Sequence, residues 1–532
     1  MRRVAILTAV VLSLASPAAA ADPVFHASQI ASDGRTVAAE IADFDGDGRS
    51  DILQILFRGQ PPREQRVIRL YVQGGDGALP TQPTSERAVP PGAAAYDILD
   101  GRDGAASQLV LLRQSDLVVL SLAPGGASRT LPLPGAGSIG ALADDRGLER
   151  VEIVHDSLGR EPRLVAVQLG ETTVLSVSGT VLGRLETGGL ANYLVPTRPG
   201  LLFFESDMRL FFDAPRISVG DVDGDGAHDI VTSTRHDVRV FHQKADGRFA
   251  ARADREYPLA LLSEHDHIRG SGGVTAQVVD LDGEGRGDLI LAHQTGGLAD
   301  ARLITRIYRN VASAWKLDAP VHTIDSQGAI GSDFPVDVDG DGRPELVRIV
   351  VPFSTMGIVK TLLTRTIQAE ARIYRPDPRT GFAAEPWVKF ELDVPFSFDT
   401  LRTSGFLPNW AVDLNADGHL DLLLSGGGEH LDVHLGGPRF NYAKRQSRTA
   451  IRTQGALRSG DLDGDALPDL LIFDPFAAGA PVQILRNLGV LPGSPTRYEP
   501  ATRTTPADDV ARDRGDGDGE DPAGSAVPEG AK

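Results

Sequence analysis

The 532-residue chain contains no cysteine and only 6% aromatic residues. Without cysteine it forms no disulfide and carries no lipid anchor of the lipoprotein type, so a packed core and bound metal must supply its stability.

No segment beyond the N-terminal region is long and apolar enough to span a membrane. A net charge of −19 with no clustered Lys/Arg face argues against nucleic-acid binding. The chain also lacks a Gly-x-Ser-x-Gly nucleophile elbow and a phosphate-binding loop. The apolar content of 41% is nevertheless sufficient for a core.

The two ends of the chain differ from its middle. Residues 1–21 begin with Met1-Arg2-Arg3, continue with a short apolar run and end in small residues, which predicts a secretory signal peptide. Cleavage is expected after Ala20 or Ala21, so the mature protein should be soluble and either secreted or periplasmic. Residues 504–532 are rich in Asp, Glu, Gly, Pro and Ala without apolar periodicity, which predicts a disordered acidic tail. Arg514-Gly-Asp516 in this tail spells a cell-adhesion tripeptide, but chance explains it better in a segment of this composition.

The residues between these ends, 22–503, contain a nine-residue acidic pattern that occurs six times. The first copy runs from Asp43 to Asp51, and the others start at Asp221, Asp280, Asp337, Asp413 and Asp461. Oxygen-bearing side chains recur at positions 1, 3, 5 and 9, a spacing that lets a short loop direct alternate carboxylates at one hard cation. The six loops hold 23 of the 72 acidic residues. Acidic β-turns without metal are the alternative, but such turns would tolerate Ser, Lys or Gln where these loops retain oxygen ligands.

The chemistry of the loop favours calcium. An EF-hand would need a Glu at position 12 and flanking helices, whereas these loops end in an acid at position 9 and enter a strand. Flexible, carboxylate-rich loops favour calcium over magnesium, and about six mainly structural sites are expected. The predicted ligands are the side chains at positions 1, 3, 5 and 9 and the backbone carbonyl at position 7: Asp43, Asp45, Asp47, Arg49, Asp51; Asp221, Asp223, Asp225, Ala227, Asp229; Asp280, Asp282, Glu284, Arg286, Asp288; Asp337, Asp339, Asp341, Arg343, Glu345; Asp413, Asn415, Asp417, His419, Asp421; Asp461, Asp463, Asp465, Leu467 and Asp469. Position 6 is Gly in five copies, and Ala466 makes the geometry of the last copy the least certain.

The segments around the loops predict a repeat of four short strands. Apolar β-favouring runs flank each loop, an Arg-flanked strand such as Val238–Phe241 follows, and a weaker fourth strand closes the unit. Loop starts are 48 to 76 residues apart from Asp221 onward, which is the spacing of β-propeller blades. The 178 residues between Asp43 and Asp221 leave room for two blades without metal. Their degenerate loops are expected at Asp97–Asp103 and at Asp144-Asp145, the second leading into a strand at Val151–Val154. The expected fold is therefore an all-β propeller of eight blades, or seven if two segments share one blade.

These loops, Asp-x-Asp-x-Asp-Gly-x-x-Asp entering a strand, resemble the FG-GAP/VCBS repeats of integrin α-chain propellers and of secreted bacterial proteins. The resemblance covers about residues 23 to 500 and is nearest to the bacterial type. It implies a calcium-stabilised propeller that serves interaction or adhesion, without naming one ligand.

The remaining features leave the biological role open. His-containing clusters at Glu264–His267 and His430–His434 are better explained as ordinary loop or blade residues than as a second metal site. An insertion at Gly357–Thr366 is expected to form a short helix, either as a loop elaboration or as a partner-contact lid. No catalytic constellation is recognisable, so the first hypothesis is a non-enzymatic module that binds a protein or cell-surface glycan. The alternatives are a carbohydrate-active enzyme, such as a polysaccharide lyase or hydrolase, and a structural subunit of an envelope assembly.

Overall fold

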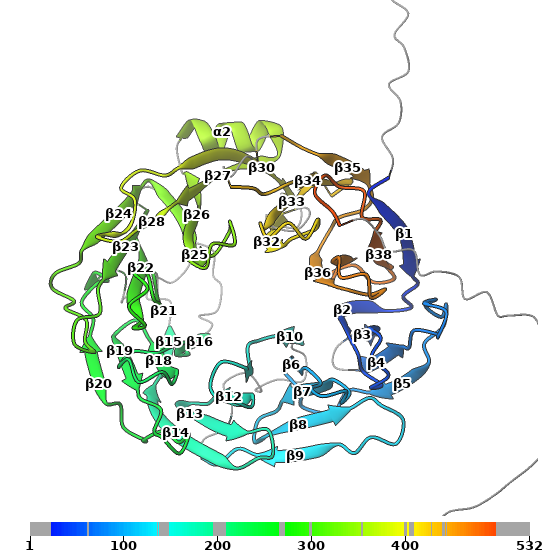
Figure 1. The fold of residues 1–532 in the computed structure, drawn as a ribbon, viewed down its shortest axis with the longest axis horizontal. Helices are drawn as coiled ribbons and strands as arrows, with labels where there is room; N and C mark the ends of the chain where they lie inside the picture. The colour runs from blue at the N-terminus through cyan, green and yellow to red at the C-terminus, as the bar shows by residue number, and fades with distance from the viewer. Residues whose placement is uncertain are drawn as a thin grey trace, which may run out of the picture. The chain divides into compact units, whose positions relative to one another are not determined.

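The computed structural model arranges eight β-sheets as the blades of a propeller around a central axis (Figure 1). It describes residues 23–495 except 61–62, 136, 138–147, 195–208, 265, 267–271, 297–300, 353–354, 398–401, 404–408, 427, 439–441 and 443. These residues belong to one compact unit that ends at Pro495. The expected signal peptide and acidic tail lie outside the described residues.

Each blade is an antiparallel meander in which strands consecutive in sequence are neighbours in the sheet. The strands of blades 1 to 4 are β2 (Arg35–Ala42), β3 (Asp51–Arg58), β4 (Gln65–Tyr71), β5 (Ser85–Ala88); β6 (Ala95–Leu99), β7 (Gln108–Leu112), β8 (Asp116–Ser121), β9 (Arg129–Pro132); β11 (Val154–His155), β12 (Arg163–Val167), β13 (Gly170–Ser176), β14 (Val181–Gly188); β17 (Arg216–Gly220), β18 (Asp229–Ser233), β19 (Asp237–Phe241) and β20 (Arg255–Pro258).

The second half of the ring follows the same plan. The strands of blades 5 to 8 are β21 (Gly273–Val279), β22 (Asp288–Thr295), β23 (Arg302–Tyr308), β24 (His322–Gln327); β25 (Ala329–Val336), β26 (Glu345–Pro352), β27 (Thr366–Tyr374), β30 (Val388–Ser397); β32 (Asn409–Val412), β33 (Asp421–Gly426), β34 (His430–His434), β35 (Ser447–Ala450); β36 (Ala456–Gly460), β37 (Asp469–Phe473) and β38 (Val482–Asn487). The structure thus confirms a propeller and fixes the number of blades at eight.

The N-terminal strand completes the last blade. β1 (Phe25–Ile30) pairs antiparallel with β38, with Phe25 opposite Asn487 and Ile30 opposite Val482. Figure 1 shows this blue strand beside the orange-red strands of blade 8. The first and last parts of the chain therefore share one sheet, which closes the ring.

Short elements decorate the blades. α2 (Thr355–Thr364) lies in the expected insertion and leads into β27, as predicted. The others are β10 (Glu149–Arg150), which runs parallel to β6, a hairpin of β15 (Leu190–Leu194) and β16 (Arg209–Asp213), a hairpin of β28 (Pro376–Asp377) and β29 (Gly381–Phe382), and β31 (Arg402–Thr403). No described helix is of a length and apolarity that would cross a membrane.

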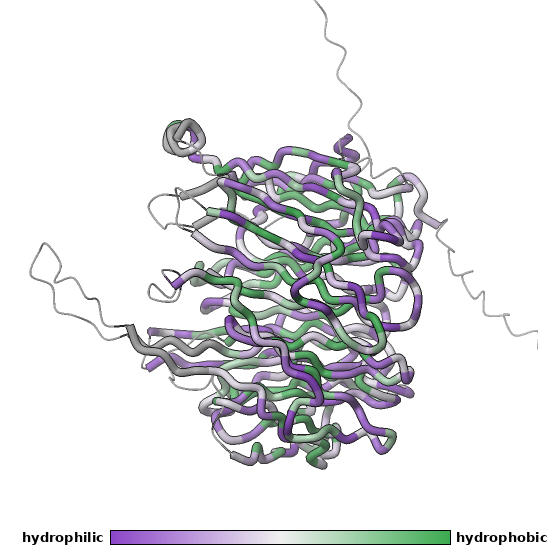
Figure 2. Tube along the Cα trace, turned by 90° about the vertical axis from the view of Figure 1, so that its left-hand side faces the viewer, coloured by the Kyte–Doolittle hydropathy of each residue, from purple (hydrophilic) through white to green (hydrophobic). Residues whose placement is uncertain are grey.

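The core is divided among the interfaces between blades. A separate cluster of buried apolar residues lies between every pair of neighbouring blades: for example, Leu53 of blade 1 packs in one cluster with Leu109 of blade 2. The equivalent cluster across the closing seam joins Ile52 of blade 1 to Leu471 of blade 8. Figure 2 shows hydrophobic stretches running through the ring, with hydrophilic residues both between them and at the turns. Each interface buries many side chains worth about 1.5–3 kcal/mol apiece.

One expectation about blade 3 is wrong. Val151–Val154 was expected to be the strand after a degenerate loop, but the first strand of the blade starts only at Val154 and the second at Arg163. The preceding residues instead run against blade 2, where the Asp97 carboxylate accepts the backbone N–H groups of Ile153 and Val154 at 2.9 Å. The hairpin loop of blade 3 is therefore 156–162, and Asp144-Asp145 lies outside the described residues.

Candidate metal centres

All six acidic loops join the first strand of a blade to its second strand. They follow β2, β17, β21, β25, β32 and β36, and the position-9 acid is in each case the first residue of the next strand. Consecutive loops touch one another: the Gly287 N–H donates to Asp221 O (2.6 Å), and the Leu420 N–H donates to Val338 O (2.9 Å). The loops therefore lie side by side on one face of the ring.

The position-1 carboxylate organises each loop from within. In all six loops one of its oxygens accepts the backbone N–H of position 6 at 2.8–2.9 Å, and the other accepts an N–H from position 4 or 5 at 2.6–3.2 Å. Position 6 has a positive φ, such as 84° at Gly48, which explains its preference for glycine. Ala466 adopts the same conformation with φ 65° and keeps the hydrogen bond to Asp461, so the last loop has the same geometry as the others.

The position-9 carboxylate is the buried anchor of the loop. The six side chains belong to residues that are at most 2% exposed. Asp51 accepts the N–H of Phe44 at position 2 and the N–H of Gln73 beyond the third strand, both at 3.0 Å. Five loops share the first of these bonds and five share the second. Four of the six acids, Asp51, Asp229, Asp421 and Asp469, make both bonds and so connect their own loop to the end of the third strand.

Burial makes these carboxylates costly as free anions. Desolvation raises the pKa of Asp51 and Asp469 to about 6 and the pKa of Glu345 and Asp421 to about 7, although backbone N–H donors oppose the shift. The neighbouring loop acids raise these pKa values further through like-charge repulsion. A bound cation would offset both the desolvation and the repulsion.

The oxygens of several loops converge as a metal site requires. Ligand atoms of Asp43, Asp45 and Asp51 all lie within 4.8 Å of one another, and groups of three also form in the loops that start at Asp221, Asp337 and Asp461. Two position-3 oxygens are buried without a hydrogen-bond partner, Oδ1 of Asp339 and Oδ1 of Asn415. Unsatisfied buried acceptors of this kind fit an ion that would take them as ligands. That the position-7 carbonyl is a ligand stays a prediction.

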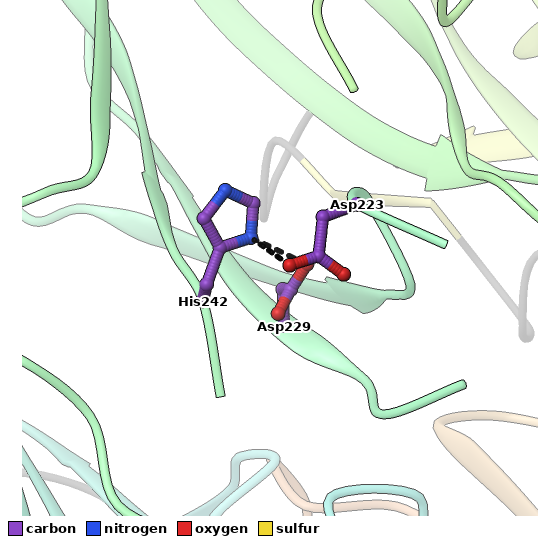
Figure 3. A group of neighbouring side chains, drawn as sticks. All are labelled: Asp223, Asp229 and His242. Carbon is purple, nitrogen blue, oxygen red and sulfur yellow. Dashed lines mark hydrogen bonds and ion pairs between the residues drawn. The ribbon is translucent and has the colours of Figure 1, made fainter. Parts of the chain in front are cut away.

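The Asp221 loop contains a nitrogen as well as oxygens. Nδ1 of His242, the residue after β19, lies 2.9 Å from Oδ2 of Asp229 and 3.5 Å from Oδ2 of Asp223 (Figure 3). The hydrogen bond to Asp229 raises the pKa of His242. The sequence pattern did not reveal His242, because the third strand follows the loop at a variable distance.

Amide side chains join neighbouring loops and were also missed from sequence. The side chain of Gln73 donates to Leu462 O of blade 8 (2.6 Å), that of Asn310 to Val222 O (2.8 Å), and that of Asn487 to Leu414 O (2.7 Å). Each acceptor is the position-2 carbonyl of the preceding loop. The available signal was an Asn or Gln near the end of the third strand, two residues after the residue that pairs with loop position 10, where Gln243 also lies.

The two His clusters are not assembled into a metal site by the described residues. His434 contacts Tyr442 O through Nδ1, whereas His430 lies 3.7 Å from Asp432. His265 and His267 lie outside the described residues, and neighbouring Asp266 accepts hydrogen bonds from the hydroxyls of Ser263 and Thr295 at 2.6 Å.

Comparison with known proteins gives one family match. The sequence model of the FG-GAP-like repeat matches residues 221–291, which contain the Asp221 and Asp280 loops. No curated protein matches the chain.

Solved structures with similar arrangements have little sequence in common with this chain. They include an Agrocybe aegerita lectin that recognises non-reducing terminal N-acetylglucosamine (14% identity, 86% of this chain and 87% of the lectin, TM-score 0.35). The V. cholerae biofilm matrix protein Bap1 (11% identity, 90% of each chain, TM-score 0.33) is another. The periplasmic gluconolactonase PpgL of Pseudomonas aeruginosa has 16% identity over 67% of this chain and 88% of its own, with a TM-score of 0.32. The repeat match over residues 221–291 and the eight-bladed ring support a β-propeller of the FG-GAP/VCBS type.

Proposed function

We propose that this chain is a secreted or periplasmic calcium-binding propeller that acts as an interaction module for a protein or a surface glycan. The observation that carries the calcium part is the buried position-9 carboxylate, which is surrounded by further acids in the same loop and whose pKa is raised towards neutrality in Asp51, Glu345, Asp421 and Asp469. Such a group is stabilised by a cation held in the loop.

Calcium suits these loops better than magnesium. The candidate ligands are mostly carboxylate oxygens on a short, glycine-containing loop, and calcium accepts 6–8 oxygens in variable geometry. Magnesium would require a nearly ideal octahedron and retains its water reluctantly. With a Kd of about 10⁻⁴ M and calcium at about 1 mM, each site would stabilise the fold by about 1.4 kcal/mol.

The calcium ions would have a structural role and would not form the site that recognises the partner. Five of the six position-9 acids accept a backbone N–H at the end of the third strand of their own blade, and in three blades an amide side chain there donates to the preceding loop. Calcium would therefore rigidify one face of the ring, and a rigid ring can present side chains and turns to a partner at fixed spacing. An N-terminal segment typical of secretion supports a role outside the cytoplasm, where calcium is abundant.

Titration calorimetry on the chelated mature protein tests the calcium part of the proposal. We expect several binding events and a rise in the melting temperature with calcium, whereas magnesium at the same concentration should give a smaller rise. A flat calcium titration would refute it.

A glycan array and an envelope-protein array, each probed in calcium and in chelator, test the interaction part. Binding that needs calcium supports the module. Catalytic turnover of a bound polysaccharide, detected as new reducing or unsaturated ends, would replace this proposal with the enzyme alternative.

A further inference from the structure

In each loop-bearing blade, the residue after the third-strand partner of loop position 10 lies next to the acidic loop. Position 10 of each loop pairs with the third strand, as Ile52 does with Tyr71 and Leu289 with Tyr308, so the next residue is adjacent to position 9. In the six loop-bearing blades that residue differs in charge: Val72, His242, Arg309, Arg375, Leu435 and Arg486. Two are apolar and four can be cationic, so the loops do not share one electrostatic environment.

In blade 5 the guanidinium of Arg309 lies within the carboxylate cluster itself. Its Nη1 is 2.5 Å from Oδ2 of Asp288 at position 9 and 3.1 Å from Oδ2 of Asp282 at position 3. Its Nη2 donates to the carbonyl oxygen of Pro378 at 2.7 Å, in the β28–β29 hairpin of blade 6. The side chain is only 12% exposed. Arg309 is therefore held from both sides, between its own loop and the neighbouring blade.

The Asp280 loop has a Glu at position 5, where the other five loops have an Asp. Glu284 pairs with Arg286 at 3.0 Å and its side chain is 62% exposed; Asp225, Asp341 and Asp417 at the same position are exposed as well. In the part of the chain that the structure describes, three converging acidic oxygens occur in the loops that start at Asp43, Asp221, Asp337 and Asp461, but not in the Asp280 loop or in the Asp413 loop, which has Asn415 at position 3.

Arginines at the equivalent place in other blades take different partners. Arg375 lies over the ring of Trp387, 3.8 Å from its centroid, and donates to Pro438 O. Arg486 donates to the carbonyl oxygen of Gly77 at 2.8 Å. Of the four side chains at this place that can be cationic, Arg309 and His242 thus lie against the position-3 and position-9 carboxylates of their loops, whereas Arg375 and Arg486 have the partners named above.

We propose that the guanidinium of Arg309 is the resident cation of the Asp280 loop and that this loop takes no calcium. A calcium ion coordinated by Asp282 and Asp288 would lie against the guanidinium, and the two positive charges would repel one another in a partly desolvated site. The planar guanidinium of an arginine can donate to two carboxylates and a carbonyl at once, and it thereby holds the loop together as a calcium ion would in the other loops. The inference rests on the proposed calcium function of the other loops.

Calcium stoichiometry tests the inference. Arg309→Met should bind one more calcium per chain than the wild type in equilibrium dialysis, while the matched variant Arg486→Met should bind the same number as the wild type. Calcium should also raise the melting temperature of Arg309→Met more than that of the wild type, because the ion replaces the lost guanidinium. Unchanged stoichiometry in Arg309→Met would overturn the inference.

A second pair of variants decides the question even if Arg309→Met does not fold. Asp280→Asn should leave the wild-type stoichiometry unchanged, whereas Asp43→Asn should lower it by one. Loss of one calcium in both variants would overturn the role of Arg309 while supporting the proposed function. A wild type that binds no calcium would instead refute the proposed function. In that case the role of Arg309 is tested by melting temperatures measured in chelator. The melting temperature of Arg309→Met should lie below that of the wild type, and that of Arg486→Met should not. Equal melting temperatures for the two variants would overturn the inference.

Discussion

The position-9 acid has two roles that conflict unless a cation is present. As a hydrogen-bond acceptor Asp51 joins two backbone N–H groups that are buried beside it. As a buried anion it is destabilised, which is why its pKa is raised to about 6. A protein without calcium in its loops would gain little from an acid here, since an amide could accept one of the two bonds without the cost of a charge.

Asp51→Asn should therefore lower the free energy of unfolding in calcium and leave it nearly unchanged in chelator. In chelator the lost hydrogen bond is offset by removal of a buried charge, and in about 1 mM calcium the variant loses the contribution of one site, about 1.4 kcal/mol. Urea unfolding in both conditions measures the difference. Asp76→Asn removes the same charge from an exposed turn and should leave the calcium response intact. An equal loss of stability for Asp51→Asn in calcium and chelator would contradict the prediction.

His293 should make the protein sensitive to acid independently of the loops. This residue of β22 is 3% exposed, and burial together with Arg306 and Arg302 lowers its pKa to about 4. Because the folded pKa lies below the ordinary value of 6.5, its contribution is complete above pH 6.5 and is lost as the pH falls towards 4. Between pH 7 and 4.5 the loss is on the order of 2 kcal/mol.

The comparison of wild type with His293→Gln isolates this contribution. The difference between their unfolding free energies should change by that amount between pH 7 and pH 4.5. His26→Gln, at an exposed position of β1, should show no such change. A pH-independent difference for His293→Gln would show that the imidazole does not titrate as inferred.

At the residue scale, the candidate ligands within each loop could be predicted from sequence, but the side chains that face the loop from the end of the third strand could not. Positions 1, 3, 5 and 9 follow from spacing alone, because the loop is local. Arg309 and His242 come from the third strand, and their position depends on the register between two strands, which spacing does not reveal.

At the scale of elements, the connections between successive loops distinguish this ring from eight independent sheets. Gln73 is 3% exposed and spans the closing seam from blade 1 to the blade 8 loop. Its partner, the carbonyl of Leu462, is adjacent to position 1 of that loop. The strands could be predicted because their apolar runs are bounded by acidic turns. The first strand of blade 3 was predicted wrongly because the Asp97 carboxylate binds the backbone of the preceding segment to blade 2.

Gln73→Leu should destabilise the ring although it preserves the volume and burial of the side chain. The change leaves the buried Leu462 carbonyl without the amide donor, at a cost of about 1–3 kcal/mol. Thermal and urea unfolding should both show the loss. Gln65→Leu, at an exposed position of β4, is the control and should stay within about 0.5 kcal/mol of the wild type. Equal stability of both variants would mean that the amide bridge contributes nothing.

At the scale of the whole ring, stability depends on closure, because the core consists of eight interfaces in series. Each blade contacts two neighbours, and the seam between blades 8 and 1 is built from segments distant in sequence. The sequence predicted the number of units, since the repeats are visible, but not that β1 belongs to the last blade. Phe25–Ile30 precedes the first loop, and local pattern does not reveal a partner more than 450 residues away.

A chain that begins at residue 31 should therefore lose much more stability than one that begins at residue 23. Removing β1 exposes the edge of β38 and takes away Phe25 and Ile30, which are both 4% exposed, at a cost of about 3–6 kcal/mol. An open edge of this kind also promotes aggregation, so light scattering should rise at a lower temperature. A peptide of residues 23–31 added in excess should restore the melting temperature, because β38 offers it six antiparallel partners. A scrambled peptide of the same composition should not restore the melting temperature. If the chain from residue 31 is as stable as the chain from residue 23, the interface between blades 8 and 1 alone holds the ring together at this seam.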